Sequence, residues 1–129
     1  MSKEGRTAQI VKAIQLVEKG IRWKPNSAPR HLLKRKRRGH LPEDATLADY
    51  EYLIRQIVQN TCAKVYLFWY ETVSYVTIVS IREENTWLVM FSMDGIMETA
   101  FVVERPDKYL SSPDYEYIGR VSEVMHHEL

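Results

Sequence analysis

Apolar side chains recur at helical spacing in the first part of the chain. Ile10, Ile14 and Val17 lie three or four residues apart, which places them on one face of a helix. The spacing predicts an amphipathic helix from about residue 6 to residue 20. Two prolines and an Asn-Ser pair follow between residues 23 and 29, and they predict a loop.

A second helical pattern begins after Thr46. Thr46 is a favoured N-cap residue, and Asp49 stands at the third helical position, where its carboxylate can complete the cap. The pattern predicts a helix that runs to about Asn60. Its core-facing positions are Leu47, Tyr50, Leu53, Ile54, Ile57 and Val58.

From residue 64 onward the period changes to two, and aromatic and β-branched residues dominate. This pattern predicts successive strands joined by short turns, with Asp94-Gly95 as a strong hairpin signal. The expected strands are 65–70, 73–81, 86–91 and 96–103, with a possible edge strand at 117–121. We therefore expect an α+β fold, in which N-terminal helices pack on a four- to five-stranded antiparallel meander sheet.

Length and composition are those of an ordinary globular domain. The chain has 129 residues, of which 45% are hydrophobic and 27% charged, so we expect one domain spanning 1–129. The single cysteine, Cys62, cannot form an internal disulfide, and no zinc-ligand spacing surrounds it. We find no signal peptide pattern and no apolar run of the about 18 residues that a membrane helix needs. We expect a cytoplasmic protein with no membrane association and no cofactor or metal.

The net charge of +1 hides a strong asymmetry. Residues 1–40 contain 12 Lys and Arg but 2 Asp and Glu, whereas residues 41–129 contain 6 and 15. The first region is therefore a basic helical or arm region, and the second is an acidic body made of a helix and the sheet. Such a split indicates contact with nucleic acid or a membrane surface. In the alternative interpretation, the basic region folds onto the acidic body and the two neutralise each other.

Most of the basic charge lies in one short run, from Arg30 to His40. Five consecutive cations, 34–38, repel one another, which a chain tolerates when the charge has an external partner. Phosphate is such a partner, and nearby aromatic residues can stack unpaired bases. A solvated segment, a nuclear-import signal or an anionic-membrane patch would also explain the run. The residues expected to contact nucleic acid, RNA rather than DNA, are Arg30, Lys34, Arg35, Lys36 and Arg37.

The same run contains two histidines, His31 and His40. A histidine with a pKa near neutrality can activate a 2′-hydroxyl or protonate a leaving oxygen in RNA cleavage. Neighbouring arginines would stabilise the charge that develops on the phosphorus centre. This reaction needs no metal when the 2′-hydroxyl is the nucleophile. Two polar surface histidines would give the same sequence pattern.

Other hydrolytic chemistries fit the sequence poorly. Asp107, Asp114 and Glu116 flank loop prolines without the arrangement of a metal-dependent nuclease. The chain has no glycine-rich phosphate loop and no Gly-x-Ser-x-Gly nucleophile motif. We interpret Cys62 as structural and the terminal 126–127 histidine pair as part of a frayed end.

The order of these features resembles a known family. A histidine-containing basic segment precedes a helix that opens with Leu-Ala-Asp-Tyr, and the last meander strand contains Glu-Thr-Ala-Phe at 98–101. The segments 105–110 and 118–120 add to the likeness. Together, over roughly residues 30 to 120, the chain resembles the phage- and mobile-element-associated branch of the barnase, EndoU, colicin and RelE group of metal-independent ribonucleases.

The resemblance implies roles for individual residues. His31 or His40 would be the acid or base, and Arg38, or its neighbours in the run, would contact the scissile phosphate. Thr99 on the last meander strand would orient that phosphate, and Lys64 at the start of the first strand would add a cation.

Three functions follow as hypotheses. The first is a small metal-independent ribonuclease or toxin-like protein that acts on RNA. The second is a non-catalytic nucleic-acid-binding or regulatory protein that uses the basic segment 30–40. The third is a protein–protein adaptor whose basic segment meets an inhibitor or another acidic protein partner.

Overall fold

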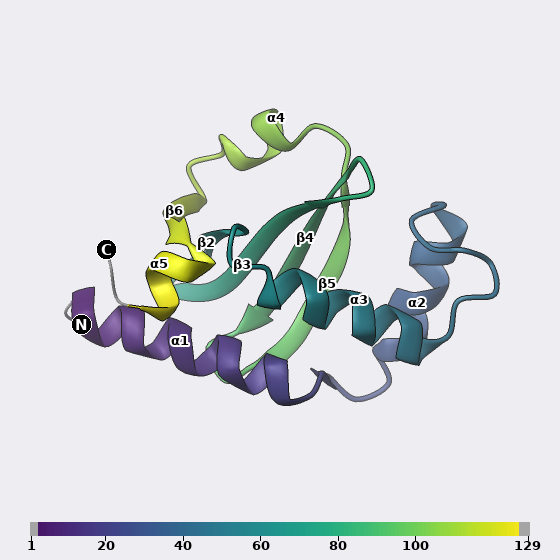
Figure 1. The fold of residues 1–129 in the computed structure, drawn as a ribbon, viewed down its shortest axis with the longest axis horizontal. Coiled ribbons are helices and arrows are strands. Elements are labelled where there is room, and N and C mark those ends of the chain that lie inside the picture. The colour runs from purple at the N-terminus through teal and green to yellow at the C-terminus, as the bar shows by residue number, and fades with distance from the viewer. Residues whose placement is uncertain (1–2, 127–129) are drawn as a thin grey trace.

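The computed structural model of the protein describes residues 3–126 and has an α+β fold (Figure 1). The predicted helices and strands appear in the predicted order, and the structure adds a ten-residue helix in the basic run, a two-residue strand before it and two five-residue helices that follow the meander. The helices are α1 (Lys3–Lys19), α2 (Ala28–Arg37), α3 (Leu47–Gln59), α4 (Pro106–Leu110) and α5 (Val121–Met125). The strands are β1 (Arg22–Trp23), β2 (Lys64–Tyr70), β3 (Val73–Arg82), β4 (Asn85–Ser92), β5 (Ile96–Val103) and β6 (Tyr115–Arg120).

The sheet has six strands in the order β1-β5-β4-β3-β2-β6. Strands β2 to β5 form the predicted antiparallel meander, and β6 pairs with β2 as the expected edge strand. The prediction of four to five strands missed β1, which pairs in parallel with the beginning of β5. A two-residue strand has no alternation to detect, and β1 borders the segment that we predicted to be a loop.

The main core lies between one face of the sheet and the helices α1, α3 and α5 (Figure 1). The predicted apolar positions face it: Ile10 and Ile14 on α1 and Tyr50 and Ile54 on α3 are completely buried. The Tyr50 hydroxyl donates a hydrogen bond to the backbone oxygen of Ala100, so this buried phenol is satisfied by β5.

The opposite face of the sheet is aromatic. A smaller cluster of buried aliphatic residues lies there under tyrosine and phenylalanine rings and under α4. Phe68 and Tyr115 lie 4.9 Å apart between ring centroids, and Tyr66 and Tyr117 lie 5.2 Å apart. Tyr109 and Tyr117 remain 42% and 52% exposed. This face is therefore only partly covered by the chain itself.

The Asp94-Gly95 turn packs closely against the N-terminal helix. Gly95 has φ +79°, and a Cβ atom added there would lie 2.8 Å from the Cβ atom of Leu16. Both the backbone conformation and the close approach therefore require glycine.

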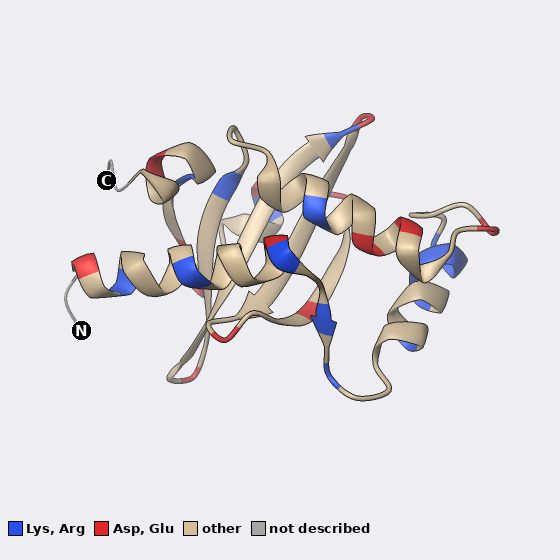
Figure 2. Cartoon of the chain, turned by 60° about the horizontal axis from the view of Figure 1, so that its bottom comes forward, with Lys and Arg blue, Asp and Glu red and all other residues tan. Residues whose placement is uncertain are grey.

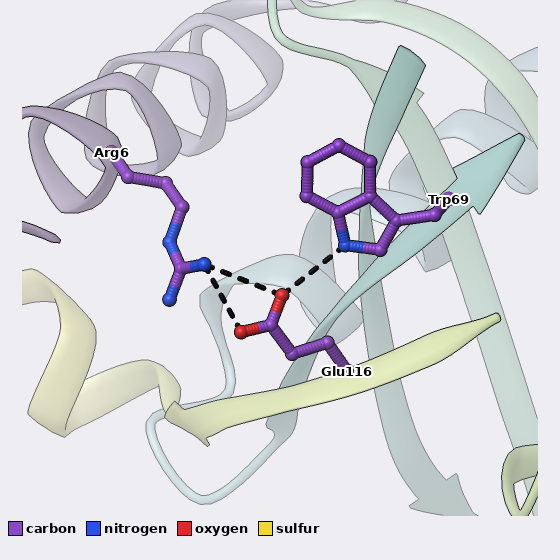
Figure 3. A network of polar contacts seen from close by, with 3 residues as sticks. All are labelled: Arg6, Trp69 and Glu116. Atoms are coloured by element: carbon purple, nitrogen blue, oxygen red, sulfur yellow. Dashed lines mark hydrogen bonds and ion pairs between the residues drawn. The ribbon is translucent and has the colours of Figure 1, made fainter. Parts of the chain in front are cut away.

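A polar network attaches α1 to the far edge of the sheet (Figure 3). Arg6 Nη1 lies 3.0 Å from Glu116 Oε2, and Trp69 Nε1 donates to Glu116 Oε1 over 3.2 Å. The three residues come from α1, β2 and β6, so the network connects the beginning of the chain to its last strand.

The predicted capping box at the start of α3 is present. Thr46 Oγ1 accepts a hydrogen bond from the Asp49 backbone N–H at 3.1 Å, and Asp49 Oδ2 accepts one from the Thr46 N–H at 2.9 Å. We expect Thr46→Ala to lower the free energy of unfolding by about 1 kcal/mol, measured by urea denaturation. Thr72→Ala, at an exposed turn, is the matched control and should change stability by less than half as much.

Candidate active site

The basic run forms helix α2, which contacts α3 and β5. Arg30, Lys34 and Arg37 are exposed and Lys36 is half-buried. Figure 2 shows Lys and Arg gathered on α2, whereas Asp and Glu mark several of the turns. Helix α2 therefore carries Arg30, Lys34 and Arg37 on its exposed side.

Ion pairing neutralises the basic region only in part. Arg6 pairs with Glu116, and Lys24 pairs with Glu98, so both pairs join the basic region to the acidic body. Among residues 3–126, no salt bridge includes a side chain between Arg30 and Arg38. The exposed cations of α2 and its C-cap are therefore not neutralised by ion pairs within the described residues.

Arg35 is the exception in the run, because it lies inside the protein. It is 3% exposed, its guanidinium lies 5.6 Å from the centroid of the Phe101 ring, and its Nη1 lies 3.0 Å from His40 Nδ1. The structure therefore does not favour the predicted contact of Arg35 with nucleic acid, since α2 turns this side chain toward the sheet.

His40 follows α2 and is fixed by two donors. Arg35 Nη1 and the Val102 backbone N–H, at 3.4 Å, both meet His40 Nδ1. An arginine and a backbone N–H can only donate, so Nδ1 is the acceptor and the ring proton lies on Nε2. Burial lowers the pKa of His40, and the positive charges of Arg35 and Arg38 lower it further. His40 is thus a neutral hydrogen-bond donor, and adding a proton at Nδ1 would break both contacts.

His31 lies earlier on α2 and stacks on the Trp23 ring, with 5.4 Å between centroids. Burial lowers its pKa, and the charges of Arg35, Arg30 and Lys34 add to this effect. No hydrogen bond or ring contact within the described residues joins His31 to His40. The two histidines therefore occupy different surroundings and do not form one acid–base pair.

A cleft of about 550 Å³ lies beside His40, between the end of α2 and the end of β5. Its polar side chains include a carboxylate, two guanidinium groups and a phenol. The full lining is Arg38, His40, Phe101, Val102, Val103, Glu104, Arg105 and Tyr109.

Three charged side chains of this cleft have no partner within the described residues. Arg38, Glu104 and Arg105 are exposed, and their side chains form no hydrogen bond or ion pair among residues 3–126. The carboxylate of Glu104 acts on the pKa of His40, which it raises slightly against the larger lowering effects. The cleft thus brings together groups that can bind an anion and move protons.

The predicted site residues separate into two groups. Arg38 and His40 line the cleft, whereas His31 and Thr99 do not. Thr99 is half-buried opposite Met90, further back along β5, and makes no side-chain hydrogen bond within the described part of the chain. Lys64 is exposed at the start of β2, where it lines another pocket.

Sequence reasoning missed three residues of the cleft, Glu104, Arg105 and Tyr109. They follow the last meander strand, in and just before α4. The signal that could have identified them is the charged pair Glu104-Arg105 directly after the predicted strand 96–103, because functional side chains commonly lie where a strand ends.

The two histidines predict an acid-sensitive stability. Because the pKa values of His31 and His40 lie below the ordinary value of 6.5, the unfolded chain binds more protons in the range just below that value. The free energy of unfolding should therefore be highest above about pH 7 and fall as the pH drops below about 6.5. Urea denaturation at both conditions measures the fall. His31→Gln should reduce it, and an unchanged pH dependence would contradict the role of His31.

Neither a metal cluster nor a membrane span emerges from the described residues. Residues 3–126 contain no group of three or more His, Cys, Asp and Glu side chains placed to hold a metal ion. None of the helices in that range has the length and apolar character that crossing a bilayer requires.

Comparisons with known proteins cover protein-family models, curated proteins and solved structures. None of the three finds a match to this chain.

Proposed function

We propose that this protein binds RNA and cleaves it through attack of the 2′-hydroxyl group, at the cleft between α2 and the end of β5. One observation carries the proposal: a carboxylate, two guanidinium groups, a phenol and a neutral imidazole line the same cleft. Acid–base groups beside cations are what transfer of a phosphodiester to its own 2′-oxygen requires.

The reaction assigns a task to each group. Glu104 accepts the proton of the 2′-hydroxyl as its oxygen attacks the phosphorus atom. Arg38 and Arg105 hold the phosphate and stabilise its added negative charge. The bond from phosphorus to the 5′-oxygen breaks, and that oxygen takes a proton from the phenol of Tyr109. The products are a 2′,3′-cyclic phosphate and a free 5′-hydroxyl.

His40 has a positioning and donor role in this scheme. Its Nδ1 atom is occupied by Arg35 and Val102, so Nε2–H remains as a donor to a phosphate oxygen. Tyr109 is suited to donate because its phenol lines the cleft and is 42% exposed, so a bound strand can reach it.

The first test is incubation of the purified protein with mixed cellular RNA in EDTA. Parent protein is compared with the double variant Arg38→Gln/Arg105→Gln and with Lys108→Gln, which removes an exposed cation of α4 that does not line the cleft. Cleavage by the parent and by Lys108→Gln, with loss in the double variant, supports the proposal. Uncleaved RNA with the parent, or equal cleavage by all three proteins, would overturn it.

Binding without cleavage is the second candidate function, and the unpaired cations on the outer side of α2 favour it. It predicts that RNA shifts on a gel but stays intact. The salt dependence of binding should then weaken in a triple variant of Arg30, Lys34 and Arg37, by about 0.7 in slope for each lost phosphate contact. Neutralising Lys12, Lys19 and Arg82 is the matched control. Intact RNA that does not shift would favour an adaptor that meets an acidic protein partner.

A further inference from the structure

A second pocket, of about 660 Å³, lies on the aromatic face of the sheet, on the other side of α4. It is formed where the starts of β2 and β4 and the end of β3 meet α4 and the connection from α3 to β2. The charged and aromatic residues of its lining include Lys64, Tyr66, Asp107 and Arg120.

Two cations stand next to each other in this pocket. Lys64 and Arg120 are register partners in the β2–β6 pair, so their side chains leave the same face of the sheet. Arg120 Nη1 donates to the backbone oxygen of Cys62 at 2.7 Å, which fixes its guanidinium. The Lys64 ammonium makes no hydrogen bond or ion pair within the described residues. An anion is the ligand that such a pair binds.

The same pocket offers an aromatic ring and a carboxylate. Tyr66 belongs to the aromatic face and lies 5.2 Å from the Tyr117 ring. Asp107 is close enough that its negative charge contributes to raising the pKa of the Tyr66 hydroxyl. A ring can stack a base, and a carboxylate can accept hydrogen bonds from an exocyclic amino group.

We propose that this pocket is a nucleotide subsite for the same RNA strand that the cleft cleaves, and that it favours bases with an exocyclic amino group. The inference rests on the proposed function and extends it from one phosphate to a longer stretch of strand. Both sites adjoin α4, which contributes Tyr109 to the cleft and Asp107 to the pocket. Strands β5 and β2 are three strand spacings apart, or about 14 Å, so a short oligonucleotide can reach both.

The test measures binding of fluorescein-labelled RNA whose 2′-hydroxyl groups are methylated. Such RNA cannot attack its own phosphates and therefore stays intact. We expect Lys64→Gln to weaken binding of a cytidine pentamer by about five- to tenfold. The same variant should leave a cytidine dinucleotide, which fills the cleft alone, unchanged. Lys64 is exposed and its side chain makes no hydrogen bond among the described residues, so the variant should fold. Lys108→Gln is the matched control on α4.

Asp107 supplies the second arm of the experiment. The parent protein should bind the cytidine pentamer more tightly than the uridine pentamer, and Asp107→Asn should reduce that difference. Equal binding of both pentamers by the parent would overturn the stated base preference.

The outcomes separate this inference from the proposed function. If Lys64→Gln weakens the pentamer no more than Lys108→Gln does, or weakens the dinucleotide equally, the subsite is refuted even when the parent cleaves RNA. If Lys64→Gln acts as expected but natural RNA stays intact, the subsite stands and the catalytic assignment fails.

Discussion

Glu104→Gln should slow RNA cleavage by about 100-fold or more, because the amide cannot accept the proton of the 2′-hydroxyl. Glutamine keeps the size of the side chain, and Glu104 is exposed and makes no hydrogen bond or ion pair within residues 3–126. The folded state should therefore be unaffected. Single-turnover cleavage of a labelled oligonucleotide gives the rate, and its affinity is measured separately on the 2′-O-methyl analogue.

The control for this substitution is Glu71→Gln. Glu71 is an exposed carboxylate in the β2–β3 turn that does not line the cleft. Glu71→Gln changes the net charge by the same amount as Glu104→Gln, so any effect of net charge on RNA affinity should be equal in the two variants. A Glu104→Gln protein that cleaves as fast as Glu71→Gln would remove Glu104 from the mechanism and leave the base unassigned.

The largest stability effect should come from His40→Ala, which we expect to lower the free energy of unfolding by about 3 kcal/mol. The substitution removes the acceptor of the buried Arg35 guanidinium, whose Nε atom already has no partner within the described residues. A buried charge without an acceptor is costly. In contrast, Arg35→Met should keep stability within about 1 kcal/mol of the parent, because an apolar side chain of similar length removes the charge itself.

A double-mutant cycle checks this interpretation by urea denaturation. His40→Ala combined with Arg35→Met should recover more than half of the stability that His40→Ala loses, since no unpaired guanidinium remains. If Arg35→Met is as destabilising as His40→Ala, the arginine contributes net stability and our account of the pair is wrong. The cycle also separates a folding defect of His40→Ala from any effect on cleavage.

Local signals in the sequence predicted much of the fold. The periodicity of α1, the Thr46–Asp49 cap of α3 and the alternation of the meander each depend on neighbouring residues, and each is found in the structure. The parallel pairing of Arg22 with Ile96 depends on residues far apart in the chain. Nothing in the two residues of β1 indicates that contact.

The candidate site was harder to predict because it depends on the direction in which each side chain points as well as on its position in the sequence. A run of five cations suggests five equivalent side chains, yet a helix turns one of them, Arg35, toward Phe101 and His40. The same folding brings residues 104 and 105 beside the end of α2. Position along the chain alone could identify Arg38 and His40 but could not supply the carboxylate beside them.

The network of Arg6, Trp69 and Glu116 has a consequence for folding during synthesis on the ribosome. Arg6 meets a residue 110 positions later in the chain, and such distant contacts form slowly. On a ribosome the N-terminal helix leaves the exit tunnel long before its docking partner on β6 has been translated. During synthesis, Arg6 in the basic region is therefore exposed before Glu116, its partner in the acidic body, has been made. Pulsed hydrogen exchange during refolding should show α1 protected no earlier than β6.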